Sequence, residues 1–462
     1  MLLFSLYLIL YALVGVTIFF DAKEISNRPN LLLHASLGIV VGQGLSSCLF
    51  FVFLIAQWPF YLQSFAEILI CGSLVFFGIQ KNNISFSDVN MIKISLNAAW
   101  KKSNLPILLF LLFFFIGMTY CFIDELHKPN GDWDAYAIWN TQARLIYRGG
   151  AHWINLFHGD YSHPDYPLLL GGLIARWWFL LGYETIYVHM AIALLQVALI
   201  ILILFWELSQ IKSRWHALVA TLILTSTPFF LDHGSSQYPD TMLSLFFLSS
   251  CVFLSMAERS KDSKTKFIFM AGLTASLAVW TKNEGALFLL ALLTSQFLLM
   301  RNLKAQVRTT LLLVVGALPV LVIVIYFKLN LAPPNDLFIH QSVAIFEKLF
   351  DLNRYSYVLI RFIQMSTAFG NGIISPLIVL IIYALLVGKD QNYPYKSYRQ
   401  IMITTMMIAC GYFMIYVITP HDLKWHIDTS IDRLMIQLLP MIVFGSFLYL
   451  KAPDILFKAQ SL

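Results

Sequence analysis

The stretch "LPILLFLLFFFIGMTYCFIDELHKPNGDWDAYAIWNTQARLIYRGG", residues 105–150, joins an apolar run to a polar segment. The first part, 105–123, has about the length that an α-helix needs to cross a hydrocarbon core roughly 30 Å thick. The second part, 131–150, carries two aspartates, two arginines and two tryptophans. Residues 105–150 therefore predict a membrane-crossing helix followed by a polar segment.

The composition favours an all-α polytopic membrane protein. Of the 462 residues, 59% are hydrophobic and 12% are charged, whereas soluble domains carry roughly 25% charged residues. Long Leu, Ile and Phe runs without strict alternation fit lipid-facing helices rather than a β-barrel. The cysteines lie in apolar runs without a C-x-x-C pair, which predicts buried thiols rather than disulfides or a zinc site. They are Cys48, Cys71, Cys121, Cys251 and Cys410.

We expect thirteen membrane spans. They lie at about 2–20, 31–56, 60–80, 105–123, 186–206, 216–231, 240–257, 267–280, 285–300, 309–327, 372–388, 401–419 and 433–450. The first run has no basic n-region and no clear cleavage site, so we expect a span there rather than a cleaved signal peptide. A further apolar stretch, 166–182, contains Arg176 and follows two prolines. It can be a span, or a helix that lies at the interface or dips partly into the membrane.

The distribution of positive charge predicts the orientation. If 166–182 does not cross, 20 of the 31 Lys and Arg residues fall in one set of loops. The short loops of the other side, near 57–60 and 232–239, hold none. By the positive-inside rule the basic side is cytoplasmic, which places the N-terminus outside and the C-terminus inside. The long loops 124–185 and 328–371 are then extracytoplasmic, and 166–182 is an interfacial helix.

This arrangement divides the chain into three parts. Residues 1–104 form an N-terminal three-span region. Residues 105–327 form a core that carries the outer loop 124–185, and residues 328–462 hold the second outer loop and the C-terminal spans. We find no internal repeat of the kind that builds two-fold transporters.

The polar segment 131–150 predicts an amphipathic helix lying flat on the outer membrane surface. Asp132 or Asp134 can cap its N-terminus, and Trp139 and Tyr147 can lie at headgroup depth. One apolar stripe follows from the helical spacing of Ala135, Trp139, Ala143 and Ile146. The plainest interpretation is an interfacial helix with a capping aspartate.

Four other polar clusters fall on the same predicted side. They are "YSHPDYPLLLGG" with His163 and Asp165, "HGSSQYPDT" with Asp240, "WTKNEG" with Lys282 and Glu284, and "TPHDLKWHIDTSIDR" with His426 and Arg433. Each alone is ordinary turn or cap chemistry. Ionisable groups near membrane depth are costly and usually face a cavity, so their shared side favours an enzyme that uses a lipid-linked phosphate. Cations would stabilise the phosphate, and a carboxylate would accept a hydroxyl proton.

The ordered motifs "DWDAYAIWNTQARLIYRGG", "HPDYPLLLGG" and "QYPDT" resemble the GT-C class of membrane glycosyltransferases. Within it, the chain is most similar to the protein O-mannosyltransferase and lipid A aminoarabinose transferase group (glycosyltransferase family 39-like). Two features depart from that group. Three spans precede the core, and its Asp-Glu pair is not obvious, since "FIDELHK" offers Asp124 and Glu125 before "DWD".

The resemblance implies a polyprenyl-phosphate sugar donor, a lipid, glycan or protein acceptor, and an inverting single displacement outside the cytoplasm. It implies Asp134 as the base, with Asp132 and then Asp124 as the alternatives. Substrate-binding roles fall to Trp139, His163, Asp165, Asp240, Lys282 and Glu284, with His426 and Arg433 at the donor phosphate. We predict no metal, although a divalent ion between Asp132, Asp134 and Asp240 stays open.

Two alternatives remain at this point. A polysaccharide polymerase or ligase with a pyrophosphate-linked donor would need a larger cationic site. A transporter or flippase would need ionisable residues at mid-membrane and broken helices, and Glu67 is the one candidate. In every case we expect a multi-pass protein of the inner or plasma membrane, or of the endoplasmic reticulum in a eukaryote, among membrane lipids and without a nucleic-acid partner.

Overall fold

The computed structural model describes residues 2–19, 31–82, 105–158, 162–299, 303–334, 342–369, 375–391 and 396–454. Within these ranges every regular element is helical, apart from one isolated bridge between Lys389 and Leu450. Several predicted basic loops, at 20–30, 83–104, 300–302, 392–395 and 455–462, lie outside the described residues. The expected all-α polytopic membrane fold is confirmed.

The helices run along the chain as follows: α1 (Leu2–Phe19), α2 (Leu31–Ala56), α3 (Phe60–Lys81), α5 (Leu105–His127), η2 (Ala135–Trp139), α6 (Asn140–Gly149), η3 (Gly150–His158), α7 (Leu169–Leu181), α8 (Ile186–Ile211), α9 (Arg214–Thr225), α10 (Pro228–Ser235), α11 (Pro239–Arg259), α12 (Lys264–Thr281), α13 (Glu284–Leu299), α14 (Leu303–Asn330), α15 (Ser342–Phe350), α16 (Leu352–Ala368), α17 (Pro376–Val387), α18 (Lys396–Ile418) and α19 (Leu423–Tyr449). Elements η2 and η3 are a π-helical turn and a kinked 3-10 segment.

Nine of the described helices are long and apolar enough to cross a membrane: α1, α2, α3, α5, α8, α11, α14, α18 and α19. The other four expected spans fall on helices that are shorter or less apolar, namely α12, α13, α17 and the pair α9 and α10. Helices α9 and α10 are separate because Thr227 is extended and Pro228 begins the next helix. Proline disfavours helical geometry in the residue before it.

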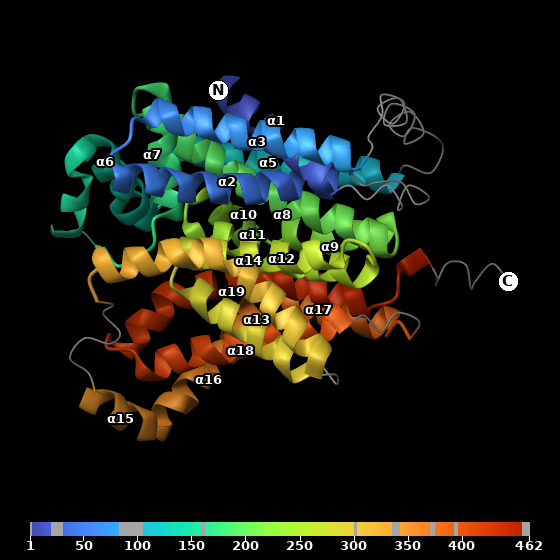
Figure 1. Ribbon diagram of the computed structural model, residues 1–462. Coiled ribbons are helices and arrows are strands. Elements are labelled where there is room, and N and C mark those ends of the chain that lie inside the picture. Colours follow the sequence, from blue (N-terminus) through green and yellow to red (C-terminus); the bar gives the residue numbers. More distant parts are fainter. Residues whose placement is uncertain are drawn as a thin grey trace.

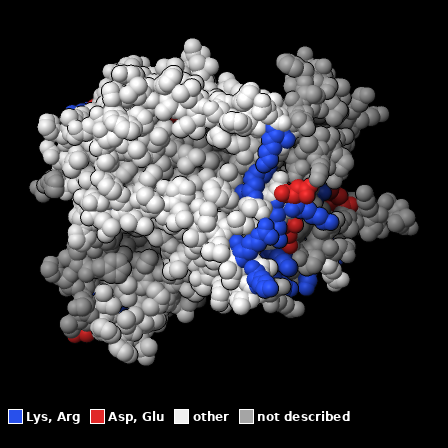
Figure 2. All heavy atoms as spheres, in the orientation of Figure 1, with Lys and Arg blue, Asp and Glu red and all other residues white. Residues whose placement is uncertain are grey.

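The two ends of the bundle differ in charge. Helices α6, α7 and α15 lie at one end, on the left of Figure 1, and the described chain ends at the other. Figure 2 shows the same face with a broad uncharged surface and with Lys and Arg side chains gathered at the right-hand end. The candidate polar motifs and the basic surface therefore lie at opposite ends.

Helix α7 follows the second polar motif and is too short to cross a hydrocarbon core by itself. Its thirteen residues span about 20 Å at 1.5 Å per residue, less than the roughly 30 Å of a hydrocarbon core. Gly182 ends the helix with φ +81°, in the left-handed region. The helix is mostly buried, and Phe179 stacks on Phe60 of α3 at 3.9 Å between ring centroids. The apolar stretch 166–182 thus forms a short helix that packs inside the bundle.

An ion pair ties α7 to the N-terminal helices. Arg176 donates to Glu67 of α3 (Nη2–Oε2 2.5 Å), and both side chains are almost fully buried. Tyr11 of α1 donates its hydroxyl to the same carboxylate. The guanidinium also lies 4.5 Å from the ring centroids of Tyr7 and Trp177. Glu67 is therefore matched by a cation, and the three-span region is joined to the helix that follows the second motif.

We expect either Glu67→Leu or Arg176→Met alone to destabilise the purified protein by roughly 3–5 kcal/mol, since each leaves a buried charge without its partner. The double variant should cost clearly less than the sum of the two, because neither charge then remains. Thermal unfolding in detergent measures all three.

The surface pair of Arg148 and Glu184 is the matched control, with side chains 66% and 24% exposed. Glu184→Gln should cost no more than about 1 kcal/mol. Strict additivity of the Glu67 and Arg176 losses would show that the two groups do not interact.

Candidate active site

The acidic motif "DWD" lies in a turn that glycine shapes. Gly131 has φ +72°, and a Cβ there would lie 2.5 Å from the Ser236 carbonyl oxygen. The Asp132 N–H donates to that same carbonyl (3.2 Å), which joins the loop to the turn before α11. The next residues form η2, a π-helical turn of a kind often found at functional sites. The expected amphipathic helix therefore begins with a distorted turn, and α6 continues it.

Asp134 forms an ion pair with Arg433, which lies 299 residues later on α19. Both side chains are partly open to water, at 26% and 23% exposure. Tyr238, in the turn before α11, contacts both members of the pair. Its hydroxyl accepts a hydrogen bond from the Asp134 N–H (3.3 Å), and its ring centroid lies 5.4 Å from the Arg433 guanidinium. Three loops that the sequence placed on one side thus meet at one carboxylate and one guanidinium.

A second ion cluster lies deeper, around Lys282. Its ammonium contacts Asp240 (3.0 Å) and Glu284 (2.8 Å), and Asp240 is fully buried. The two carboxylates hold the pKa of this lysine well above its usual value, against the effect of burial. Gln437 donates to Asp240 and lies one helical turn after Arg433 on α19. The two clusters therefore adjoin through one face of α19.

Three rings form a stack in the second motif. Tyr166 lies between Trp139 and His163, with centroid distances of 5.2 and 4.7 Å and nearly parallel planes. Burial raises the pKa of Tyr166, and the charges of Lys282, Glu284, Asp165 and Arg433 all act on its hydroxyl. Trp139 is only 2% exposed, so it supports Tyr166 from inside rather than facing a ligand. The stack therefore lies close enough to both ion clusters for their charges to act on Tyr166.

Asp165 joins the second motif to the "WTKNEG" turn. Its carboxylate accepts a hydrogen bond from Asn283 (2.9 Å), and its backbone carbonyl accepts one from Lys328 of α14 (2.5 Å). Lys328 also donates to Asn283 (2.9 Å). These bonds fix the loop before α7 against the end of α14.

The other two candidate acids lie beside a different cation. Lys128 contacts Asp124 (3.5 Å) and Asp132 (3.4 Å), and Ser235 donates to Asp124 (2.7 Å). Asp132, Asp134 and Asp240 thus face three different cations rather than one another. No group of three or more potential metal ligands occurs in the described part of the chain. The residues present do not fit the divalent-metal site that the sequence left open.

His426 lies on α19 two turns before Arg433, and its Nδ1 is 2.7 Å from the Thr419 hydroxyl. Its ring contacts those of Tyr416, His421 and Trp425. His426 bonds to Thr419, whereas Arg433 bonds to Asp134. His426 therefore borders the site rather than joining either ion cluster.

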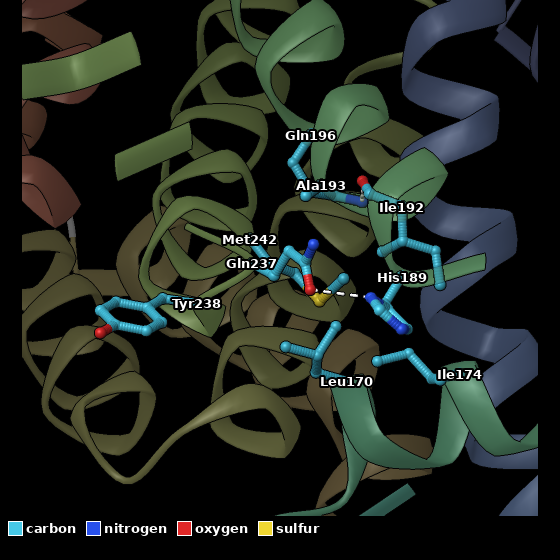
Figure 3. A pocket seen from close by; sticks show the side chains of 9 residues that line it. All are labelled: Leu170, Ile174, His189, Ile192, Ala193, Gln196, Gln237, Tyr238 and Met242. Carbon is cyan, nitrogen blue, oxygen red and sulfur yellow. Dashed lines mark hydrogen bonds between the residues drawn. The ribbon is translucent and has the colours of Figure 1, made fainter. Parts of the chain in front are cut away.

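A polar chain supports the site from behind. Gln237 accepts hydrogen bonds from His189 of α8 (2.8 Å) and from Asn140 of α6 (3.0 Å). Gln237 and Tyr238 both line a cavity of about 10 Å³. In Figure 3 the Tyr238 ring points away from His189. Such a cavity has room for about one water molecule. It is too small for a sugar, and it lies behind the residues that hold Tyr238.

Sequence reasoning missed several residues that build the site: Tyr166, Tyr238, Asn283, Lys328 and Gln437. Lys328 could have been found from the sequence, because the charge bias predicts that this end of the apolar span is extracytoplasmic, where a lysine is unusual under the positive-inside rule. The two tyrosines carried none, since tyrosine is common at membrane interfaces whatever its role.

We expect Gly131→Ala to cost at least about 1–2 kcal/mol, because an alanine is strained at positive φ and its Cβ would meet the Ser236 carbonyl. Thermal unfolding measures the loss. Gly150 also has positive φ, but its Cβ would meet no atom within 4 Å, so Gly150→Ala isolates the backbone strain. Equal losses in both variants would show that the contact with Ser236 contributes nothing.

Residues 162–327 match a family described as dolichyl-phosphate-mannose-protein mannosyltransferase. The matched part includes His163, Asp165, Asp240, Lys282 and Glu284, whereas the "DWD" motif and Arg433 lie outside it. No curated protein and no solved structure matches the chain significantly. The resemblance expected from the motifs is confirmed over this part. The chain is thus a multi-pass membrane protein by its nine described membrane-length helices, and its residues 162–327 are similar to a family of dolichyl-phosphate-mannose-protein mannosyltransferases.

Proposed function

We propose that the protein moves a sugar from a polyprenyl-phosphate donor to an acceptor hydroxyl, with inversion, on the extracytoplasmic side of the membrane. One observation carries this proposal. Asp134 and Arg433 lie side by side, partly open to water, at the end of the bundle that carries α6 and α7. A carboxylate can accept the proton of the acceptor hydroxyl, and a guanidinium can stabilise the charge on the donor phosphate. The match to a family named for a dolichyl-phosphate-mannose donor supports the donor class.

Arg433 is the group we assign to the donor phosphate. A guanidinium binds phosphate oxygens with two parallel hydrogen bonds and stabilises the charge that gathers on the leaving group. Lys282 is less suited to direct contact, because its ammonium already lies between two carboxylates. Through Gln437 and Asp240, the Lys282 cluster instead supports the α19 face that presents Arg433.

Asp134 is the group we assign to the acceptor. Its carboxylate takes the proton of the acceptor hydroxyl while the hydroxyl oxygen forms a bond to the anomeric carbon of the sugar. The bond between that carbon and the phosphate oxygen breaks, and its electron pair goes to the phosphate. The products are the glycosylated acceptor and the polyprenyl phosphate. Attack from the face opposite the phosphate inverts the anomeric centre.

The charge distribution supports the extracytoplasmic side. The Lys and Arg side chains of the visible face gather at the end opposite α6 and α7, and positive charge favours the cytoplasmic side. The exposed Trp133, at 78%, stands between the two aspartates, where an aromatic ring can rest among headgroups or against a sugar.

We expect Asp134→Asn to lower kcat/KM for sugar transfer by roughly 100-fold or more, the usual contribution of a general base. The assay is transfer from a radiolabelled polyprenyl-phosphate sugar by membranes. Asp132→Asn and Asp124→Asn should lose less, because their carboxylates contact Lys128 rather than Arg433. Asp428→Asn removes an exposed carboxylate of α19 that pairs with Arg361, and serves as the control. A larger loss in Asp132→Asn than in Asp134→Asn would move the base to Asp132.

The orientation has its own test. Ala151→Cys, in a variant with Cys410→Ser, places a thiol on the exposed start of η3. We expect an impermeant maleimide to label it from the extracytoplasmic side of intact cells, and to label Lys261→Cys only after the membrane is opened. The reverse pattern would place the proposed site in the cytoplasm.

A further inference from the structure

We propose that the donor phosphate and the Asp134 carboxylate compete for Arg433, so that donor binding releases the carboxylate to act on the acceptor. This inference rests on the proposed function and adds an order of events to it. In the free protein, Asp134 occupies the position at Arg433 that the phosphate takes. The protein is then ready to activate an acceptor hydroxyl only after the donor has bound.

The two cations of the site differ in how firmly they are held. Lys282 contacts two carboxylates, and its side chain is 10% exposed. Arg433 contacts one carboxylate, Asp134, in a pair whose members are 23% and 26% exposed. Separating an ion pair costs less where water can reach its members than where both are buried. An incoming anion therefore displaces Asp134 from Arg433 far more readily than it displaces Asp240 from Lys282.

Arg433 keeps other support when Asp134 leaves. Its guanidinium lies over the Tyr238 ring, 5.4 Å from the centroid, and cation–π contacts of this kind do not depend on the carboxylate. Asp240 also acts on the Arg433 charge from the neighbouring cluster. The guanidinium can thus remain in place and receive a phosphate, which accepts from its fork in the same geometry as a carboxylate.

Asp134 is placed so that its side chain can move. It precedes the π-helical turn η2, and its carboxylate makes no capping hydrogen bond to that turn. Its backbone is held separately, by the hydrogen bond from its N–H to the Tyr238 hydroxyl. A rotation of the side chain alone therefore frees the carboxylate without moving the loop.

The exchange also explains why base and phosphate site can be neighbours. While it is paired, the carboxylate accepts from Arg433 and has fewer lone pairs for an acceptor proton. Once phosphate binds, the two anions repel each other, which drives Asp134 away from the guanidinium. The affinity of the free protein for the donor is lowered by the fraction of molecules in which Arg433 is occupied.

Binding of undecaprenyl phosphate to the purified full-length protein in nanodiscs tests the exchange. We expect Asp134→Asn to bind this lipid roughly 3- to 10-fold more tightly than wild type, because the competitor is gone. Arg433→Gln should bind it at least 10-fold more weakly. Asp428→Asn is the matched control, since it removes an α19 carboxylate that pairs with another arginine, Arg361 of α16. The affinity of this variant for the lipid should change less than 2-fold. Asp134→Ser repeats the test if the asparagine variant does not fold.

Three outcomes separate the inference from the proposed function. Tighter binding in Asp134→Asn, with unchanged affinity in Asp428→Asn, supports the exchange. Wild-type binding that stays equal or weakens in Asp134→Asn overturns the exchange and leaves the proposed function intact. Failure of wild type, Asp134→Asn and Asp134→Ser alike to bind the lipid overturns both. A parallel titration with inorganic phosphate tells whether the phosphate alone, without its lipid chain, is sufficient.

Discussion

The ion pair of Asp134 and Arg433 joins the loop after α5 to the last helix of the bundle. Charges near membrane depth must be matched, because each unmatched charge costs several kcal/mol. That constraint explains why segments far apart in the chain meet where they do. Asp240 reaches Lys282, Asp165 reaches Asn283 and Lys328, and Asp134 reaches Arg433. The polar end of the bundle is held together by these pairs, and the proposed chemistry uses the pair that is most open to water.

The same constraint makes the N-terminal helices part of the scaffold. The acid that would suit a transport pathway, Glu67, is instead bound by Arg176 and Tyr11. Arg176 lies on α7, ten residues after Tyr166, which stacks with Trp139 and His163. Helix α7 also accepts a hydrogen bond from Ser47 of α2 at the Leu169 carbonyl. The three-span region thus fixes the helix that presents the second motif, although it precedes the part that matches the mannosyltransferase family.

The fold could be predicted from the lengths of the apolar runs and from the distribution of charged residues. Apolar run lengths predicted the long helices well, because hydrocarbon thickness fixes them. One expected span, 216–231, is divided at Pro228 into α9 and α10. Charge asymmetry predicted that the polar motifs share one side, and the contacts of Asp134 with Arg433, of Asp240 with Lys282 and of Asp165 with Asn283 bring them together. It could not pair them, since Arg433 and Lys282 are equally plausible partners for Asp134 until the helices are placed. Tyr166 and Tyr238 could not be predicted as site residues, because tyrosine is common at membrane interfaces whether it anchors a helix or contacts site residues.

The loop that carries Asp134 and the α19 helix that carries Arg433 share one surface. Cross-linking in native membranes is the most direct test of this arrangement. A variant with Asp134→Cys and Arg433→Cys, in a background without the native cysteines, is treated with a short bifunctional maleimide and digested. The structure predicts a peptide that links positions 134 and 433, and none that links 134 to Lys261→Cys at the opposite end. If both cysteines react singly but no 134–433 link forms, the two residues do not share a site and the account is contradicted.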